Sequence, residues 1–184
     1  MYQDLIERLK QDPVNRDKFK KLFRETEVPT KKTLLCEGDI SNNIYFIKKG
    51  CLRLWFNNDG KDITFQFFFE NNAVSSIESF LEEKPSQFNL ESIEPSKLVV
   101  LSRAGFEILG NHYPELKEGF FKLMLNRMNN YANLFLSRIK DNPRKRYDEL
   151  VKTHPEIIRR IPQHYIASYL GITPISLSRI RNKK

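Results

Sequence analysis

The chain has 184 residues, of which 40% are hydrophobic and 29% charged, a globular composition that excludes disordered and fibrous classes. Two cysteines are too few for a secreted disulfide scaffold, no apolar run reaches the roughly 20 residues that cross a bilayer, and the N-terminus lacks a signal sequence, so a cytoplasmic protein without a membrane partner is expected. The net charge of +8 indicates either an anionic partner or a solvated basic surface.

Residues 3–23 carry apolar side chains at partly helical spacing, interrupted by Asp12-Pro13, and predict an N-terminal helix. From Val28 to Ser102, short β-rich runs alternate with turn residues, which predicts an all-β sandwich or barrel. Asp59-Gly60 lies between two such runs and is a strong hairpin signal. The predicted strands are Thr33–Cys36, Ile44–Lys48, Cys51–Phe56, Ile63–Phe69 and Leu98–Ser102.

A barrel-shaped metalloenzyme is the main catalytic alternative for this region. Its metal would need imidazole and carboxylate ligands on the strands. All three histidines, His112, His154 and His164, lie outside the predicted strands, and no catalytic triad, HExxH or phosphate-binding glycine loop is present. The sequence therefore predicts a protein that is not an enzyme and has no metal site. Cys36 and Cys51 are expected to pack as small apolar residues of the β region.

The stretch EGDISNNIYFIKKGCLRLW (37–55) resembles the β-roll signature of cyclic-nucleotide-binding domains. The matching features are Gly38-Asp39, an apolar-aromatic strand and Gly50, whose freedom from a Cβ suits a turn between stacked strands. Together with the C-terminal motif described below, this stretch resembles the Crp/Fnr family of transcription regulators. The resemblance implies a double-stranded, jelly-roll-like β-roll.

In cyclic-nucleotide binders of this family, an arginine neutralises the ligand phosphate and a glutamate meets the ribose hydroxyl. Matching by the resemblance places Ser76 near the glutamate position and Ser86-Gln87 near the Arg-Ser position. Because a buried phosphodiester needs a charged partner, cyclic AMP is not an expected ligand and no cofactor is assigned. Ser75, Ser76, Ser86 and Gln87 are the candidate lining of a pocket for another effector, and an empty pocket is the alternative.

After Pro114, a run without proline extends to Lys140 and predicts one long helix. Its apolar residues form two stripes, one of which has coiled-coil spacing. One stripe should face the β-roll and the other the same helix of a second subunit, although burial of both within one chain is an alternative. The predicted dimer interface comprises Phe121, Met124, Met128, Tyr131 and Phe135.

The basic excess lies at the C-terminal end of the chain. Residues 140–184 hold eleven Lys and Arg against four acids, whereas the first 139 residues hold twenty against nineteen. Within this segment, residues 143–160 predict an amphipathic helix, and Gln163–Arg181 fits a helix-turn-helix motif. Counting Gln163 as first, the small fifth residue is Ala167 and the ninth is Gly171. The remaining five constraints require apolar residues, which are Ile166, Leu170, Ile172, Leu177 and Ile180.

The second helix of such a motif enters the DNA major groove. Arg179 is the first candidate for bidentate guanine readout, and Ile175 for contact with a thymine methyl. Other side chains would contact phosphates. The predicted DNA-binding residues are Gln163, Thr173, Pro174, Ile175, Ser176, Ser178, Arg179, Arg181 and Lys183.

The sequence thus predicts an α+β fold with a sensor domain over 1–113, a dimerisation helix over 114–142 and a helix-turn-helix domain over 143–184 that lacks the usual wing. The expected function is a homodimeric regulator that binds a partly palindromic operator in double-stranded DNA, with RNA polymerase as a further candidate partner. The alternative is a β-roll module that senses a small molecule and acts through protein contacts, without specific DNA binding.

Overall fold

A computed structural model describes residue 7 and residues 11–182. Two compact units are present: the first extends to Leu54 and includes Phe68–Met124, and the second comprises Trp55–Phe67 and the chain from Leu125 onwards. This division differs from the three segments expected from the sequence, because a hairpin of the β region belongs with the C-terminal helices. Within the described residues, no helix combines the length and apolarity needed to cross a bilayer.

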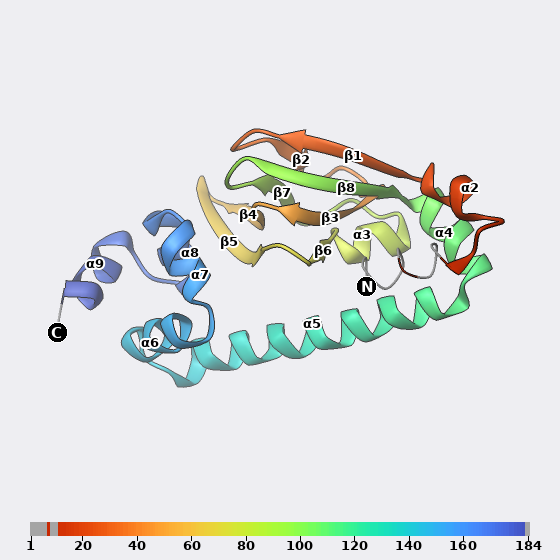
Figure 1. Cartoon of the computed structure of the whole chain (residues 1–184). Helices are drawn as coiled ribbons and strands as arrows, with labels where there is room; N and C mark the ends of the chain where they lie inside the picture. The colour runs from red at the N-terminus through yellow and green to blue at the C-terminus, as the bar shows by residue number, and fades with distance from the viewer. Residues whose placement is uncertain (1–6, 8–10, 183–184) are drawn as a thin grey trace. The chain divides into compact units, whose positions relative to one another are not determined.

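Two antiparallel sheets form the β-roll (Figure 1). One has the strand order β1-β8-β3-β6, and the other has the order β2-β7-β4-β5, in which β4 carries the chain from the first unit into the second. The strands are β1 (Phe23–Val28), β2 (Thr33–Leu35), β3 (Asn43–Lys49), β4 (Leu52–Asn58), β5 (Lys61–Phe68), β6 (Ala73–Val74), β7 (Asn89–Ser92) and β8 (Ser96–Ser102).

The register of the first sheet is set by β8, which pairs with both β1 and β3. Phe23 lies opposite Leu101 on one side, and Ile44 lies opposite the same residue on the other. β8 reads SKLVVLS, and its four central apolar residues are buried, as expected for a strand between two neighbours. The central strand therefore supplies much of the core of this sheet.

The hairpin predicted at Asp59-Gly60 is present between β4 and β5. Both residues have positive φ, 51° for Asp59 and 80° for Gly60. Two consecutive left-handed residues are the signature of the turn whose twist matches that of paired strands. The backbone geometry thus confirms the hairpin predicted at Asp59-Gly60.

Helices cover the core of the first unit. α3 (Ile77–Glu82), α4 (Arg103–His112) and the start of α5 (Pro114–Lys140) bring together Phe80, Phe106 and Phe120, whose ring centroids lie 4.9–6.4 Å apart. These rings join residues of β3 and β8 in one buried cluster. α5 has the bounds that the sequence predicted, because no proline or strong cap interrupts it.

Three expectations differ from the structure. Of the helix expected over 3–23, Glu7 and Gln11 are helical and α2 spans Arg16–Lys20, whereas Phe23 begins β1; Leu5, Ile6 and Leu9 lie outside the described residues. The helix expected over 143–160 is two helices, α6 (Pro143–Thr153) and α7 (Pro155–Arg160), since Pro155 cannot donate a backbone hydrogen bond. Cys51 is buried as expected, but Cys36 is exposed.

Gly50 provides a test of the turn between β3 and β4. Its φ is +107°, and a Cβ at this position would lie 2.8 Å from Ser96 Cα on β8. Since backbone atoms would have to move, Gly50→Ala should lower the free energy of unfolding by about 2–4 kcal/mol. Gly119→Ala in α5 is the matched control, because nothing lies within 4 Å of its added Cβ. Urea unfolding measures both, and unchanged stability of Gly50→Ala would contradict the steric argument.

Candidate nucleic-acid interface

The second unit joins the tip of the β4-β5 hairpin to the C-terminal helices. Ser168 Oγ accepts a hydrogen bond from Thr64 N and donates one to Asp62 O, each at 2.8 Å. Beside this anchor, the Phe67 and Tyr169 rings lie 5.3 Å apart. The Phe65 and Tyr131 rings, 4.7 Å apart, attach the same hairpin to α5. The hairpin is therefore a structural part of the helical unit.

α8 (Gln163–Leu170) and α9 (Pro174–Asn182) form the predicted pair of helices. Gly171 ends α8 with φ of 67°, the left-handed value that the motif requires of its ninth residue. Ala167 at the fifth position is fully buried, which allows the two helices to approach closely. Ile166, Leu170 and Leu177 are also buried, whereas Ile172 and Ile180 are half-buried. The sequence motif thus corresponds to two helices joined by a turn at Gly171.

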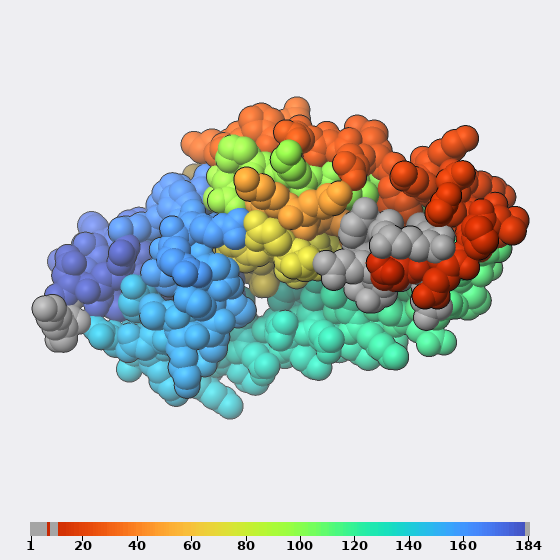
Figure 2. Space-filling model, in the orientation of Figure 1, coloured from red at the N-terminus to blue at the C-terminus, as the bar shows by residue number. Residues whose placement is uncertain are grey.

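α9 presents a polar and exposed face opposite its buried residue. Leu177 is fully buried, whereas Ile175 is 66% exposed and Ser178, Arg179 and Arg181 are exposed. Figure 2 shows the blue-violet atoms of α9 at the surface of their unit. An exposed isoleucine at the start of a basic helix is available to a partner, because nothing in the described chain covers it.

The turn before α9 is fixed by a side-chain cap. Thr173 Oγ1 accepts a hydrogen bond from Ser176 N at 3.1 Å, and the two side chains bond each other at 3.0 Å. Pro174 occupies the first helical position, where no backbone donor is needed. Both features agree with the expectations from the sequence, and they fix the direction in which α9 starts.

The remaining predicted DNA-binding residues lie at the surface or outside the described part of the chain. Gln163 is exposed at the start of α8, and Ser176 is half-buried. Lys183 lies outside the described residues. The structure thus brings Thr173, Ile175 and Arg179 onto one short helix with its cap, and places Gln163 on the preceding helix.

The basic cluster at the start of α6 is engaged within the unit. Arg144 Nη1 donates to Ile180 O at 2.9 Å, and its Nε pairs with Asp148 at 3.0 Å. Lys145 Nζ pairs with Asp141 at 2.6 Å, and Arg146 Nη1 donates to Asp141 O at 2.7 Å. Arg144 therefore satisfies a carbonyl at the C-terminal end of α9, a place where a cation is favoured.

The four residues predicted to line an effector pocket differ in their partners and exposure. Ser86 Oγ donates to Ser76 Oγ at 2.8 Å, whereas Ser75 Oγ bonds Ser41 Oγ at 3.0 Å. All three of these predicted serines are buried, but Gln87 is exposed. The serine hydroxyls thus satisfy one another.

Two arginines of the first unit were not singled out from the sequence. Arg53 is buried and pairs with Glu91, with 2.7 Å between Nε and Oε1. Arg103 Nη2 donates to Ser41 O at 2.7 Å, and its Nη1 lies 2.7 Å from a Glu83 carboxylate oxygen. Arg103 belongs to α4, so its guanidinium lies beside α3 only because the chain folds. Its charge is already matched by Glu83.

α5 carries an exposed apolar stripe that differs in part from the predicted interface. Phe121, Met128 and Phe135 are 59%, 62% and 64% exposed. Met124 instead packs against the core of the first unit, and Tyr131 lies on Phe65. The exposed stripe continues through Leu125 and Ile139, which are 40% and 67% exposed. Together with Ala132, the residues of the stripe follow one another at spacings of three or four.

Loss of the α9 cap should destabilise the second unit. Thr173→Ala removes the acceptor for Ser176 N and should lower the free energy of unfolding by about 1 kcal/mol. Thr173→Ser keeps a hydroxyl in the same place and should retain most of the stability. Urea unfolding followed by helical circular dichroism compares the three proteins, and equal losses in both variants would show that the hydroxyl has no capping role.

Comparison with known proteins gives one match to a family model and several similar folds. Residues 25–113 match the family model of the cyclic nucleotide-binding domain. No curated protein matches the sequence of the chain significantly.

Solved regulators share the fold over most of the chain. A CooA mutant from Carboxydothermus hydrogenoformans is 16% identical, with a TM-score of 0.70 over 88% of this chain and 76% of that one. The c-di-GMP responsive global regulator CLP from Xanthomonas campestris is 14% identical, with a TM-score of 0.74 and coverage of 91% and 88%. A structure described as a transcriptional regulator of the Crp/Fnr family, from Eubacterium rectale, is 15% identical, with a TM-score of 0.74 and coverage of 91% and 81%.

The fold expected from the resemblance is therefore confirmed, since these likenesses extend over the β-roll, the long helix and the C-terminal helices. Residues 25–113 therefore match the cyclic nucleotide-binding domain model, and the chain shares its overall fold with these solved structures.

Proposed function

We propose that the chain is a homodimeric transcription regulator that binds a specific site in double-stranded DNA through α9. The observation that carries this proposal is the exposed face of α9, where Ile175 is 66% exposed on a helix that also presents Arg179 and Arg181. The helix is held from behind by its buried Leu177 and begins at a fixed cap. RNA polymerase is a further partner that rests on the resemblance alone.

The residues of α9 divide between base reading and backbone positioning. Arg179 can donate two parallel hydrogen bonds to guanine O6 and N7, the commonest specific contact in the major groove. Ile175 lies one helical turn earlier and offers an aliphatic surface to a thymine methyl. Gln163, Thr173 and Ser178 are polar and exposed, which suits them to phosphate oxygens.

A dimer follows from the exposed stripe on α5. Large apolar side chains that are 40–67% exposed along one helix face favour association with a matching surface, and the same stripe on a second copy is self-complementary. Two copies of α9 would then read half-sites about 34–36 Å apart, one turn of the DNA helix.

Cyclic AMP is not part of the proposed function. A bound phosphodiester needs a cation free to pair with it. The cation near α3 is Arg103, whose guanidinium already pairs with Glu83 and donates to Ser41 O. The mutual hydrogen bond of Ser76 and Ser86 supports the same conclusion, because these residues stand where the resemblance expects ligand-binding groups.

Selection from random duplex DNA at moderate salt tests the DNA proposal. The full chain should enrich a two-fold symmetric site, and Arg179→Ala should lose about 1–3 kcal/mol of discrimination at one guanine of each half-site. Sequencing of the bound pool measures both. Lys152→Ala on α6 is the control, since an exposed lysine away from α9 should leave the selected sequence unchanged.

The other outcomes of the selection are also decisive. Binding without enrichment would mean that phosphate contacts alone act, and it would contradict base reading by α9. Failure to bind at low salt would overturn the DNA proposal and favour a β-roll module that acts through protein contacts.

Charge placed in the apolar stripe should dissociate the dimer. Met128→Glu combined with Phe135→Glu puts two carboxylates where the partner helix would bury methionine and phenylalanine, and sedimentation should then show monomers. Asn126→Glu is the control, because residue 126 is exposed on another face of α5. A persistent dimer in the double variant would show that subunits associate elsewhere.

A further inference from the structure

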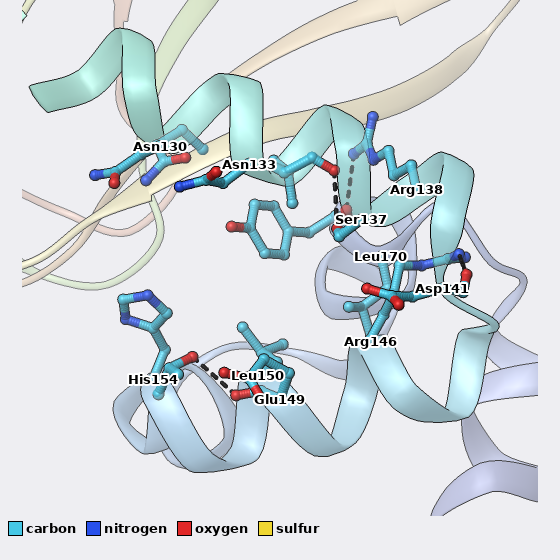
Figure 3. Close-up of a pocket in the computed structure, with 14 residues that line it drawn as sticks. Asn130, Asn133, Ser137, Arg138, Asp141, Arg146, Glu149, Leu150, His154 and Leu170 are labelled. Carbon is cyan, nitrogen blue, oxygen red and sulfur yellow. Dashed lines mark hydrogen bonds between the residues drawn. The ribbon is translucent and has the colours of Figure 1, made fainter. Parts of the chain in front are cut away.

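A hollow with both polar and apolar walls lies within the second unit, between α5, α6 and the end of α8. Its volume is about 450 Å³, within the range of small-molecule sites. In Figure 3, Asn130 and Asn133 project from α5 on one side, and Glu149, Leu150 and His154 lie on the other. Every lining residue belongs to this unit.

The lining carries hydrogen-bonding groups that the described chain leaves unused. Within residues 7 and 11–182, no side-chain hydrogen bond is made by the carboxamides of Gln66, Asn130 or Asn133. Each carboxamide offers both donors and an acceptor. His154 bonds Glu156 through Nδ1, at 3.2 Å, which leaves Nε2 for another partner. This chemistry fits a ligand with several hydroxyl groups.

Two guanidinium groups give one side of the hollow a positive character. Arg138 Nη2 donates to Tyr169 O at 2.8 Å, and Arg146 Nη1 donates to Asp141 O at 2.7 Å, so both side chains are held in place with other N–H groups to spare. Burial lowers the pKa of Arg138, which a bound anion would offset. The Asp141 carboxylate is paired with Lys145, and Glu149 remains as an acceptor for hydroxyls.

We propose that this hollow binds a small hydroxylated anion of the sugar-phosphate or sugar-acid class. Its anionic group would pair with Arg138 and Arg146, and its hydroxyls would bond Asn130, Asn133 and Glu149. Gln66 on β5 contributes to the lining, but the site does not include Ser75, Ser76, Ser86 or Gln87 and does not depend on the DNA proposal. Because its walls come from α5, α6 and α8, a bound ligand fastens the C-terminal helices to α5.

Thermal unfolding of the full chain with glucose 6-phosphate and with gluconate tests the proposal. A ligand that binds only the folded state stabilises it by mass action, so at about one hundred times the dissociation constant the midpoint should rise by about 5 °C. Glucose and inorganic phosphate each supply half of the chemistry and should give smaller shifts. Titration calorimetry then gives the dissociation constant of the better probe.

Asn133→Ala and Asn130→Ala should each weaken binding about tenfold, the loss expected for one hydrogen bond of a polar ligand. Both residues are exposed, so the ligand-free midpoint should not change. Asn126→Ala is the matched control, because it is an exposed asparagine of the same helix that does not line the hollow.

Three results would overturn the proposal. The first is no shift with either probe. The second is an equal shift with inorganic phosphate, which would indicate general attraction to the basic surface. The third is undiminished binding in the asparagine variants, which would place the ligand elsewhere. A DNA selection that fails while these shifts occur would leave the site intact and remove only the proposed function.

Discussion

The structure depends on one long helix that has to satisfy three different environments. α5 buries Leu116 and Phe120 in the core of the first unit, exposes Phe121, Met128 and Phe135, and presents Asn130 and Asn133 to the hollow. A straight helix repeats every 3.6 residues, so each environment can be met by a separate stripe without a kink. A residue inserted in α5 would rotate every later residue by about 100° relative to the earlier ones and so break the alignment between these environments. The fold therefore constrains the length of α5 as strongly as its composition.

Charge in the C-terminal segment serves internal structure as well as its proposed partner. Arg144, Lys145 and Arg146 stand together in the sequence and look like a phosphate-binding cluster. In the structure they bond Ile180 O, the Asp141 carboxylate and Asp141 O, respectively. The net charge of the segment is thus an overestimate of the charge available to DNA. In the proposed function, specificity for a DNA sequence depends on the few exposed residues of α9, of which Arg179 and Ile175 are the clearest.

The sequence predicted best what depends on short-range geometry. The Asp59-Gly60 hairpin, the ends of α5, the Gly171 turn and the Thr173 cap each follow from two or three neighbouring residues, and each is present. β1 was missed because half of FRETEV is charged, and its pairing with β8 is a tertiary contact. No local pattern reveals three other features, which are the Arg53–Glu91 pair, the approach of Arg103 to α3 and the Ser168 anchor. Each of them joins residues that lie 24 to 106 positions apart in the sequence, and Arg53 and Glu91 are more buried than charged residues usually are. The two apolar stripes of α5 were recognised, but Met124 and Tyr131 turn inward because α5 packs on the chain itself.

The Ser168 anchor has a consequence for the order in which the molecule can fold. Asp62 and Thr64 are more than one hundred residues from Ser168, at separations of 106 and 104. Contacts of such high sequence separation form late, because a long loop must close before they contribute. During synthesis the hairpin leaves the ribosome well before α8. Phe65 can pack on Tyr131, and Phe67 on Tyr169, only after α5 and α8 have also been synthesised. The C-terminal helices are consequently not an independent folding module, and their final packing requires a piece of the roll made long before them.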